Sequence, residues 1–421
     1  MSLLKNIEVV KYFWIYTRGV NMNFEFSNRI ENAKASAIRE ILKLMADPNI
    51  ISFGGGNPAA DSFPIEMITT ISNYLLSNEG NKVLNYGVSE GDPKLKDEII
   101  RYFSRNEVIK KSYDEVLITS GSQQIMDFMA KIFCNEDDVV ICEQPSFIGA
   151  LNAFKSNGAK LVGCSLEDDG IHLGELENAM AAFPKPKFVY LIPNFQNPTG
   201  ITTSLEKRKA IYALAKKYKI IILEDNPYGE LRFKGVPIPS IKSLDDEGLV
   251  VYAASLSKII APGMRVAMMM GHEQIIQKAV VAKQCNDVHT NGWAQSVMAN
   301  FLSAVNIEEH LKHLQTIYRL KAQSMLNCME LYFHESVSWT NIEGGMFVWV
   351  SLPSGIDMLQ FVKEAINRKV AIIPGNAFYT DDQISSNSFR MNFSTPSLEQ
   401  IEEGVQILGE LINEMIEETS N

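Results

Sequence analysis

The sequence predicts an α/β fold with a large lobe built on a mostly parallel sheet and a smaller α+β lobe. Its 421 residues exceed the usual size of one hydrophobic core, so two lobes are expected. Between residues 115 and 271, short runs of Val, Ile and Leu alternate with helical patterns, which is typical of a parallel sheet with covering helices. Beyond residue 304 the order of strands and helices changes to an α+β pattern.

Seven apolar runs are expected to form the strands of the large lobe. Their nearly continuous branched side chains indicate burial on both faces. One helix, residues 203–218, lies between two of these runs and has Thr203 or Ser204 as its N-cap. The predicted strands are residues 115–119, 138–145, 159–166, 187–194, 219–225, 249–255 and 265–271.

The remaining segments are assigned to the smaller lobe. Residues 22–75 carry one helix and a turn-rich stretch, too little for a separate domain, so this segment is expected to join the C-terminal lobe. The predicted division is therefore residues 22–75 and 305–421 for the small lobe, with residues 76–304 forming the large one. The predicted elements of the small lobe are strands at 344–353 and 389–394, an extended piece at 370–375, and helices at 36–47, 358–369 and about 398–416.

Composition excludes several classes of protein. A formal net charge of −11 argues against a nucleic-acid backbone or an anionic membrane as partner. No apolar run approaches the roughly 20 residues that a membrane helix needs. Five scattered cysteines without a C-x-x-C motif indicate free thiols in the cytoplasm. No histidine spacing indicates a metal site, and His310 and His313 are expected on a solvated helix face.

Polar side chains follow the ends of several predicted strands, where open parallel sheets bind their ligands. Taken singly, most have simpler explanations: Ser122 would be a helix cap, Asn197 a turn residue and Gly56 part of a turn. Burying the carboxylate of Asp225 at the end of a strand costs free energy unless a cation binds it. The whole set comprises Ser122, Gln123, Phe147, Asn197, Asp225, Tyr228, Ser255, Ser257, Lys258 and Arg265.

One ligand, pyridoxal 5′-phosphate, has a use for all of these side chains. The Lys258 amine can form a Schiff base with its aldehyde. Its phosphate suits the Ser122 helix start together with Ser255, Ser257 and Arg265. The other contacts expected are an acid at the protonated ring nitrogen (Asp225), donors to the ring oxygen (Asn197, Tyr228) and an aromatic ring stacked on the pyridine (Phe147).

Three motifs, in matching order and spacing, resemble the signatures of fold-type I aminotransferases of classes I and II. They are "PNFQNPTG" (193–200), "EDNPY" (224–228) and "SLSKIIAPGMR" (255–265). Four others, "SAIREILK", "ISFGGGNP", "SGSQQ" (120–124) and "FRMNFS", resemble the subgroup of 2-aminoadipate, kynurenine and broad-specificity aromatic aminotransferases, and the resemblance covers about residues 22–415. The sequence departs from the family at Ala267, usually Gly, and at Phe147, often Tyr, where stacking survives without the hydroxyl.

The resemblance implies the fold of pyridoxal-phosphate-dependent transferases, fold type I, and a reaction. An amino group would move by ping-pong kinetics between an aromatic, 2-aminoadipate-like or branched L-amino acid and a 2-oxo acid such as 2-oxoglutarate. Lys258 would form the Schiff base and carry the proton, Asp225 would keep the ring protonated, and Tyr228 would assist.

The resemblance also implies substrate and subunit contacts. Arg390 and Asn197 would bind the α-carboxylate, with Gly56 beside them. Arg39 would contact an acidic substrate side chain. The alternative is that Arg39 simply lies on the solvent-exposed face of an N-terminal helix. Tyr86 matches a tyrosine that reaches the phosphate of the neighbouring subunit, which implies a homodimer with shared sites.

Two other functions remain open at this point. The same cofactor and fold serve lyases, racemases and decarboxylases, which the cofactor motifs alone do not exclude. A cofactor-sensing transcription regulator is disfavoured, because only about 50 residues precede "GGGNP" and the chain is acidic.

Overall fold

The computed structural model describes residues 24–27, 47, 49–381 and 384–420. The chain divides into two compact units, Met1–Lys34 and Ala35–Asn421. All elements named below belong to the second unit. The predicted helix at residues 36–47, with Arg39, lies outside the described residues apart from Asp47.

The large sheet has eight strands in the order β2-β9-β8-β7-β6-β3-β4-β5. The pairs β3–β4, β3–β6, β6–β7 and β7–β8 are parallel, which confirms the predicted α/β class. β9 runs antiparallel to both β2 and β8. The strands are β2 (Asp114–Thr119), β3 (Val139–Gln144), β4 (Lys160–Glu167), β5 (Gly170–Ile171), β6 (Phe188–Leu191), β7 (Ile221–Asn226), β8 (Val250–Ser255) and β9 (Ala267–His272).

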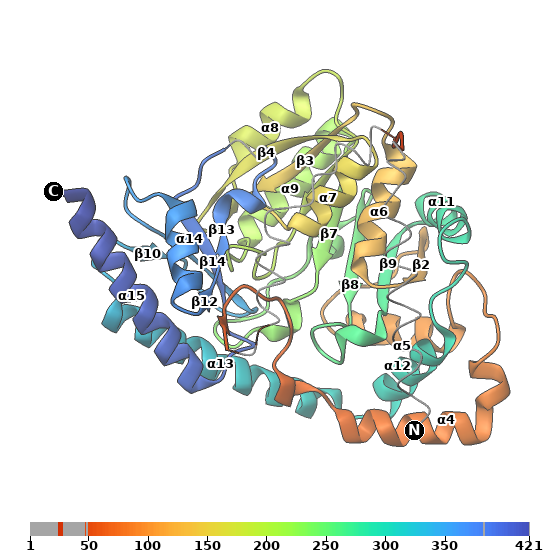
Figure 1. Cartoon of the computed structure of the whole chain (residues 1–421). Helices are drawn as coiled ribbons and strands as arrows, with labels where there is room; N and C mark the ends of the chain where they lie inside the picture. The colour runs from red at the N-terminus through yellow and green to blue at the C-terminus, as the bar shows by residue number, and fades with distance from the viewer. Residues whose placement is uncertain (1–23, 28–46, 48, 382–383, 421) are drawn as a thin grey trace. The chain divides into compact units, whose positions relative to one another are not determined.

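Helices cover both faces of this sheet (Figure 1). Alternate strand residues point to opposite faces, so Ile222 packs in one apolar cluster and Leu223 in the other. One face is covered by α8 (Leu173–Ala181), α9 (Leu205–Tyr218) and α10 (Ile241–Leu244). The other packs against α5 (Pro93–Ser104), α6 (Ser122–Phe133), α7 (Ile148–Ser156), α11 (Glu273–Gln284) and α12 (Gly292–Ala304). Of the two predicted caps, Ser204 begins α9 by accepting from the Lys207 N–H.

The C-terminal part has its own antiparallel sheet in the order β10-β11-β14-β13. An N-terminal strand, β1 (Ile51–Ser52), pairs in parallel with β12 (Val370–Ala371), while α4 (Ile65–Val83) contacts α12. The proposed lobe boundaries remain a prediction. The other elements are β10 (Ser338–Trp339), β11 (Phe347–Ser351), β13 (Ile373–Pro374), β14 (Ser388–Asn392), α13 (Ile307–Tyr332), α14 (Met358–Asn367) and α15 (Leu398–Ser420).

One sequence expectation on α13 is wrong. His310 does not lie on a solvated face: its Nε2 is 2.6 Å from the Ile259 carbonyl and its ring packs edge-on against Phe301. Burial therefore lowers its pKa. Within the described part of the chain, His, Cys, Asp and Glu side chains form no group of three or more suited to a metal ion.

No helix among the described residues combines the length and the apolar character needed to cross a bilayer.

Candidate active site

A cavity of about 310 Å³ lies beyond the carboxyl ends of β6, β7 and β8, between the large sheet and the C-terminal part of the chain. Twelve of the fourteen residues predicted from the sequence line it. They are Gly56, Ser122, Gln123, Phe147, Asn197, Asp225, Tyr228, Ser255, Ser257, Lys258, Arg265 and Arg390. Of the other two, Tyr86 is 88% exposed and does not line the cavity, while Arg39 lies outside the described residues.

Lys258 follows β8 and places its amine inside the cavity. Its Nζ donates a hydrogen bond of 2.6 Å to the Gly56 carbonyl, which joins the end of β8 to the segment after β1. Burial, together with the charges of Arg265 and Arg390, lowers the pKa of this amine to about 8. A substantial neutral fraction near pH 8 suits a nucleophile that condenses with an aldehyde.

Asp225, near the end of β7, is a buried carboxylate with one oxygen unpaired. Its Oδ2 accepts from the Tyr190 hydroxyl at 2.9 Å, whereas the buried Oδ1 has no hydrogen-bond partner among the described residues. Burial raises the pKa of Asp225 to about 7, against the hydrogen bond from Tyr190. A cationic N–H donor at Oδ1 would satisfy both the orphan oxygen and the charge, as a protonated pyridine nitrogen does.

Part of the cavity lining forms a cradle suited to an anion. Ser122 begins α6, Ser255 ends β8 and Ser257 lies on the loop that follows β8. Among the described residues, the Arg265 guanidinium donates hydrogen bonds to the carbonyls of Pro262 and Ser120 and forms no ion pair with a carboxylate. Helix start, hydroxyls and free guanidinium together suit a dianionic phosphate.

Gly121, before α6, shows why this cradle needs a glycine. Its φ is +82°, and a Cβ built there would lie 2.1 Å from Arg265 Nη2. Any side chain at this position would therefore displace the guanidinium. At Gly56 the situation differs, because an added Cβ would meet Phe347 Cζ at an ordinary 3.6 Å.

Arg390, on β14, is a buried cation that forms no ion pair with any described carboxylate. Its Nη1 donates to Asn197 Oδ1 at 2.8 Å and its Nη2 to the Gly54 carbonyl at 2.6 Å, while Nε is buried without a partner. Burial lowers its pKa to about 10. The guanidinium stacks over Phe347, with Cζ 4.2 Å from the ring centroid. A buried, uncompensated guanidinium favours binding of a carboxylate.

Asn197, Tyr228 and Phe147 also line the cavity. Asn197 Nδ2 donates to the Tyr228 hydroxyl at 3.4 Å, and burial raises the pKa of Tyr228 above its ordinary value. Phe147, which precedes α7, contributes a partly buried ring to the lining.

Sequence reasoning missed several site residues. Tyr190, on the neighbouring strand β6, donates a hydrogen bond to Asp225; its hydroxyl, the one polar side-chain group in the apolar sequence of β6, was the available signal. The remaining missed lining residues are mainly apolar and carried no distinguishing signal: Gly54, Gly55, Ile148, Ile192, Pro227, Pro262, Phe347, Ile373 and Phe378.

Comparison with known proteins agrees with this geometry. The family model of aminotransferases class I and II matches residues 48–408. The aromatic-amino-acid aminotransferase 1 of Thermococcus litoralis is 37% identical over 393 residues, which cover 92% of this chain and 94% of the relative. A kynurenine aminotransferase of Pyrococcus horikoshii, solved with PMP, aligns with a TM-score of 0.89 at 37% identity, covering 92% and 97%.

A third relative was solved with a phosphopyridoxyl compound. The α-aminoadipate aminotransferase of Thermus thermophilus, in complex with N-(5′-phosphopyridoxyl)-L-leucine, aligns with a TM-score of 0.85 at 34% identity, covering 93% of this chain and 98% of that one. The chain therefore belongs to the aminotransferases of classes I and II. It is a pyridoxal-phosphate-dependent enzyme that transfers amino groups between amino acids and 2-oxo acids, as the resemblance implied.

Proposed function

We propose that the enzyme takes aromatic, 2-aminoadipate-like or branched L-amino acids, with a 2-oxo acid such as 2-oxoglutarate as acceptor. The observation that carries this proposal is one cavity holding Lys258, the unpaired oxygen of Asp225 and the uncompensated Arg390. An aromatic and aliphatic lining around Arg390, including Phe347, Ile373 and Phe378, favours a largely apolar substrate side chain. The aromatic, kynurenine and α-aminoadipate names of similar proteins support the same range.

The residues have separate roles in the proposed reaction. When bound, pyridoxal phosphate supplies an aldehyde that condenses with amines and a ring that accepts electrons. Lys258 would be the amine that condenses with this aldehyde, and as a neutral amine it would remove the proton from the substrate Cα. Asp225 keeps the ring nitrogen protonated, and Arg390 orients the substrate through its α-carboxylate. Ser122, Gln123, Ser255, Ser257 and Arg265 bind or border the phosphate, while Phe147, Asn197 and Tyr228 orient the ring.

A half-reaction and a donor screen test this proposal. Enzyme loaded with cofactor is mixed with one amino acid without acceptor, and the aminated cofactor and the 2-oxo acid are quantified. Carbon dioxide or ammonia release in place of these products would instead support a decarboxylase or lyase. Turnover with 2-oxoglutarate is then compared for aromatic, dicarboxylic and branched donors, and activity with none of these classes would overturn the proposed substrate range.

Replacing Arg390 with glutamine is expected to weaken substrate binding strongly. Loss of a buried, charge-assisted carboxylate contact should raise KM for the amino acid about a hundredfold. Affinity for pyridoxal phosphate should change little. Arg232→Gln is the matched control, because Arg232 also stacks on a ring, that of Phe195, but pairs with Glu343 outside the cavity. Equal KM values for Arg390→Gln and wild type would show that Arg390 does not bind the substrate.

We further propose a cytoplasmic homodimer in which Tyr86 reaches the partner's phosphate. Tyr86 is exposed, its ring meets His289 edge-on at 5.7 Å, and Leu84 and Val88 beside it are exposed as well. The five cysteines are all unpaired, as in a reducing compartment. Sedimentation is expected to give twice the mass of one chain, and Tyr86→Phe should weaken binding of the cofactor without altering that mass. A monomer with full activity would contradict the shared site.

A further inference from the structure

A buried lysine outside the cavity, Lys283 on α11, lies directly behind the anion cradle. Its side chain is 0% exposed and makes three kinds of contact. Nζ donates to Gln124 Oε1 at 2.9 Å, to the Asp287 carboxylate at 2.9 and 3.0 Å, and to Thr290 Oγ1 at 2.9 Å. An ammonium group has three hydrogens, so these acceptors occupy its full donor capacity.

These contacts reach the cradle through the two ends of its loop. Asp287 Oδ2 accepts from the Ser120 hydroxyl at 2.5 Å, and Gln124 Oε1 also accepts from the Ser120 backbone N–H at 2.9 Å. Ser120 and Gln124 flank Gly121 and Ser122, the start of α6. Lys283 and Asp287 therefore hold both ends of the segment whose N–H groups face the anion.

The same cluster also supports Arg265. The Arg265 guanidinium contacts the Ser120 carbonyl and occupies the space above Gly121 that a Cβ would fill. A shift of Ser120 would therefore move both a guanidinium contact and the helix start. Ser120 lies between β2 and α6, and its hydroxyl is also 3.2 Å from Thr290 Oγ1, another acceptor of Lys283.

The turn that carries Asp287 is held by Lys283 itself. The backbone N–H groups of Asn286, Asp287 and Val288 donate to the Lys283 carbonyl at 2.9, 3.0 and 3.1 Å. Val288 has a φ of 65°, an unfavourable value for a β-branched residue. Such local strain persists where the surroundings determine the conformation and is typical of functional segments.

We propose that Lys283 and Asp287 are positioning residues that set the phosphate affinity of the cofactor site without touching the cofactor. The proposal rests on the assignment of Ser122, Ser257 and Arg265 to the phosphate, made above. Replacing Lys283 should therefore weaken the binding of pyridoxal phosphate through its phosphate group, while binding through the pyridine ring should not change.

The test compares two probes that differ only in the phosphate. Dissociation constants of pyridoxal phosphate and of pyridoxal are measured by absorbance titration for wild type and Lys283→Met. Loss of the charged support should weaken pyridoxal phosphate about tenfold or more, while pyridoxal stays within about twofold. Ser120→Ala, which removes one hydroxyl contact to Asp287, should shift the same ratio in the same direction by a smaller factor and serves if Lys283→Met does not fold.

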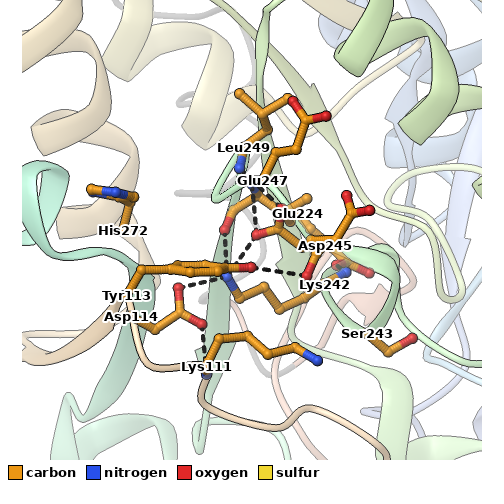
Figure 2. Close-up of polar contacts among 12 residues, drawn as sticks. Lys111, Tyr113, Asp114, Glu224, Lys242, Ser243, Asp245, Glu247, Leu249 and His272 are labelled. Carbon is orange, nitrogen blue, oxygen red and sulfur yellow. Dashed lines mark hydrogen bonds and ion pairs between the residues drawn. The ribbon is translucent and has the colours of Figure 1, made fainter.

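Lys242 provides a matched control (Figure 2). It is equally buried and likewise donates to three residues, in this case two aspartates and a carbonyl: Asp114 at 2.8 Å, Asp245 at 2.9 Å and the Val250 carbonyl at 3.0 Å. It lies on α10 and contacts neither the cradle nor the cavity lining. Lys242→Met should lose stability to urea as Lys283→Met does, but keep the wild-type ratio of the two dissociation constants.

Arg265→Gln separates this inference from the proposed function. If Arg265→Gln lowers phosphate preference but Lys283→Met and Ser120→Ala do not, Lys283 is only structural and the inference is wrong. The same conclusion follows if Lys242→Met changes the ratio as much as Lys283→Met. If Arg265→Gln leaves the ratio unchanged, the assignment of the phosphate site itself is wrong.

Discussion

Replacing Lys258 with alanine is expected to abolish transamination and covalent attachment of the cofactor. The change removes the amine that holds the aldehyde and moves the proton, so kcat should fall roughly 10⁴-fold or more, the scale for loss of a covalent nucleophile. Borohydride treatment followed by mass spectrometry should find the cofactor on Lys258 in wild type and on no residue in the variant. Rates are measured in single turnovers, so that slow cofactor loss does not obscure the chemistry.

Lys321→Ala is the matched control for this experiment. Lys321 is also partly buried and donates to backbone carbonyls, those of Ser394 and Pro396, but does not line the cavity. It should retain covalent attachment and turnover near wild type. Turnover by Lys258→Ala close to the control's value would show that another residue carries the chemistry.

The pKa of Lys258 adds a pH dependence to the same prediction. Only the neutral amine attacks an aldehyde, and a pKa of about 8 in the cofactor-free protein places its titration near that pH. The rate of covalent attachment should therefore rise from pH 6 to about pH 8 and level off above it. Stopped-flow absorbance follows the reaction, and a rate still rising steeply at pH 10 would contradict a lowered pKa.

Replacing Asp225 with asparagine is expected to reduce turnover far more than cofactor affinity. The amide carries no charge to keep the ring nitrogen protonated, so the electron sink weakens while the shape of the site remains. The expected loss in kcat is about 10²–10³-fold, as for removal of one electrostatic contact to a transition state. Glu143→Gln is the control, because Glu143 is another buried acid with a pKa raised to about 7 by burial, but does not line the cavity.

The same variant should stabilise the cofactor-free protein at high pH. The pKa of Asp225 is about 7 when folded and near 4 when unfolded, so above pH 7 the folded protein holds a buried charge that costs free energy. This cost is absent below pH 4 and grows as pH rises to 7. Asp225→Asn should therefore gain a few kcal/mol in free energy of unfolding at pH 8 and little at pH 4.5.

Urea unfolding of the cofactor-free proteins at these two pH values measures the difference. An unchanged kcat in Asp225→Asn would show that Asp225 does not keep the ring nitrogen of the cofactor protonated. Equal stability changes at both pH values would show that its carboxylate is not buried as a charge.

Much of the large lobe was predictable because buried parallel strands have a clear local pattern. All seven predicted strands are present within a few residues of their predicted ends, and a side chain that follows such a strand must lie at the same edge as its neighbours. Asp225, Ser255 and Lys258 were therefore found together without any knowledge of contacts. The short β5 was missed because two residues carry no periodicity.

The sequence by itself determined the class of fold, the cofactor chemistry and most of the residues around one cavity, since strand ends and turn motifs are local signals. Only the tertiary structure decided which groups lack partners there. Arg390 and Asn197 are 193 residues apart and meet across the cavity, and Lys283 binds Gln124, which lies 159 residues before it in the chain. Hydrogen bonds of this kind depend on side chains that folding brings together. Water would solvate Asp225 and Arg390 in an unfolded chain, so only the folded structure shows that an oxygen of Asp225 and the Nε of Arg390 are buried without a partner.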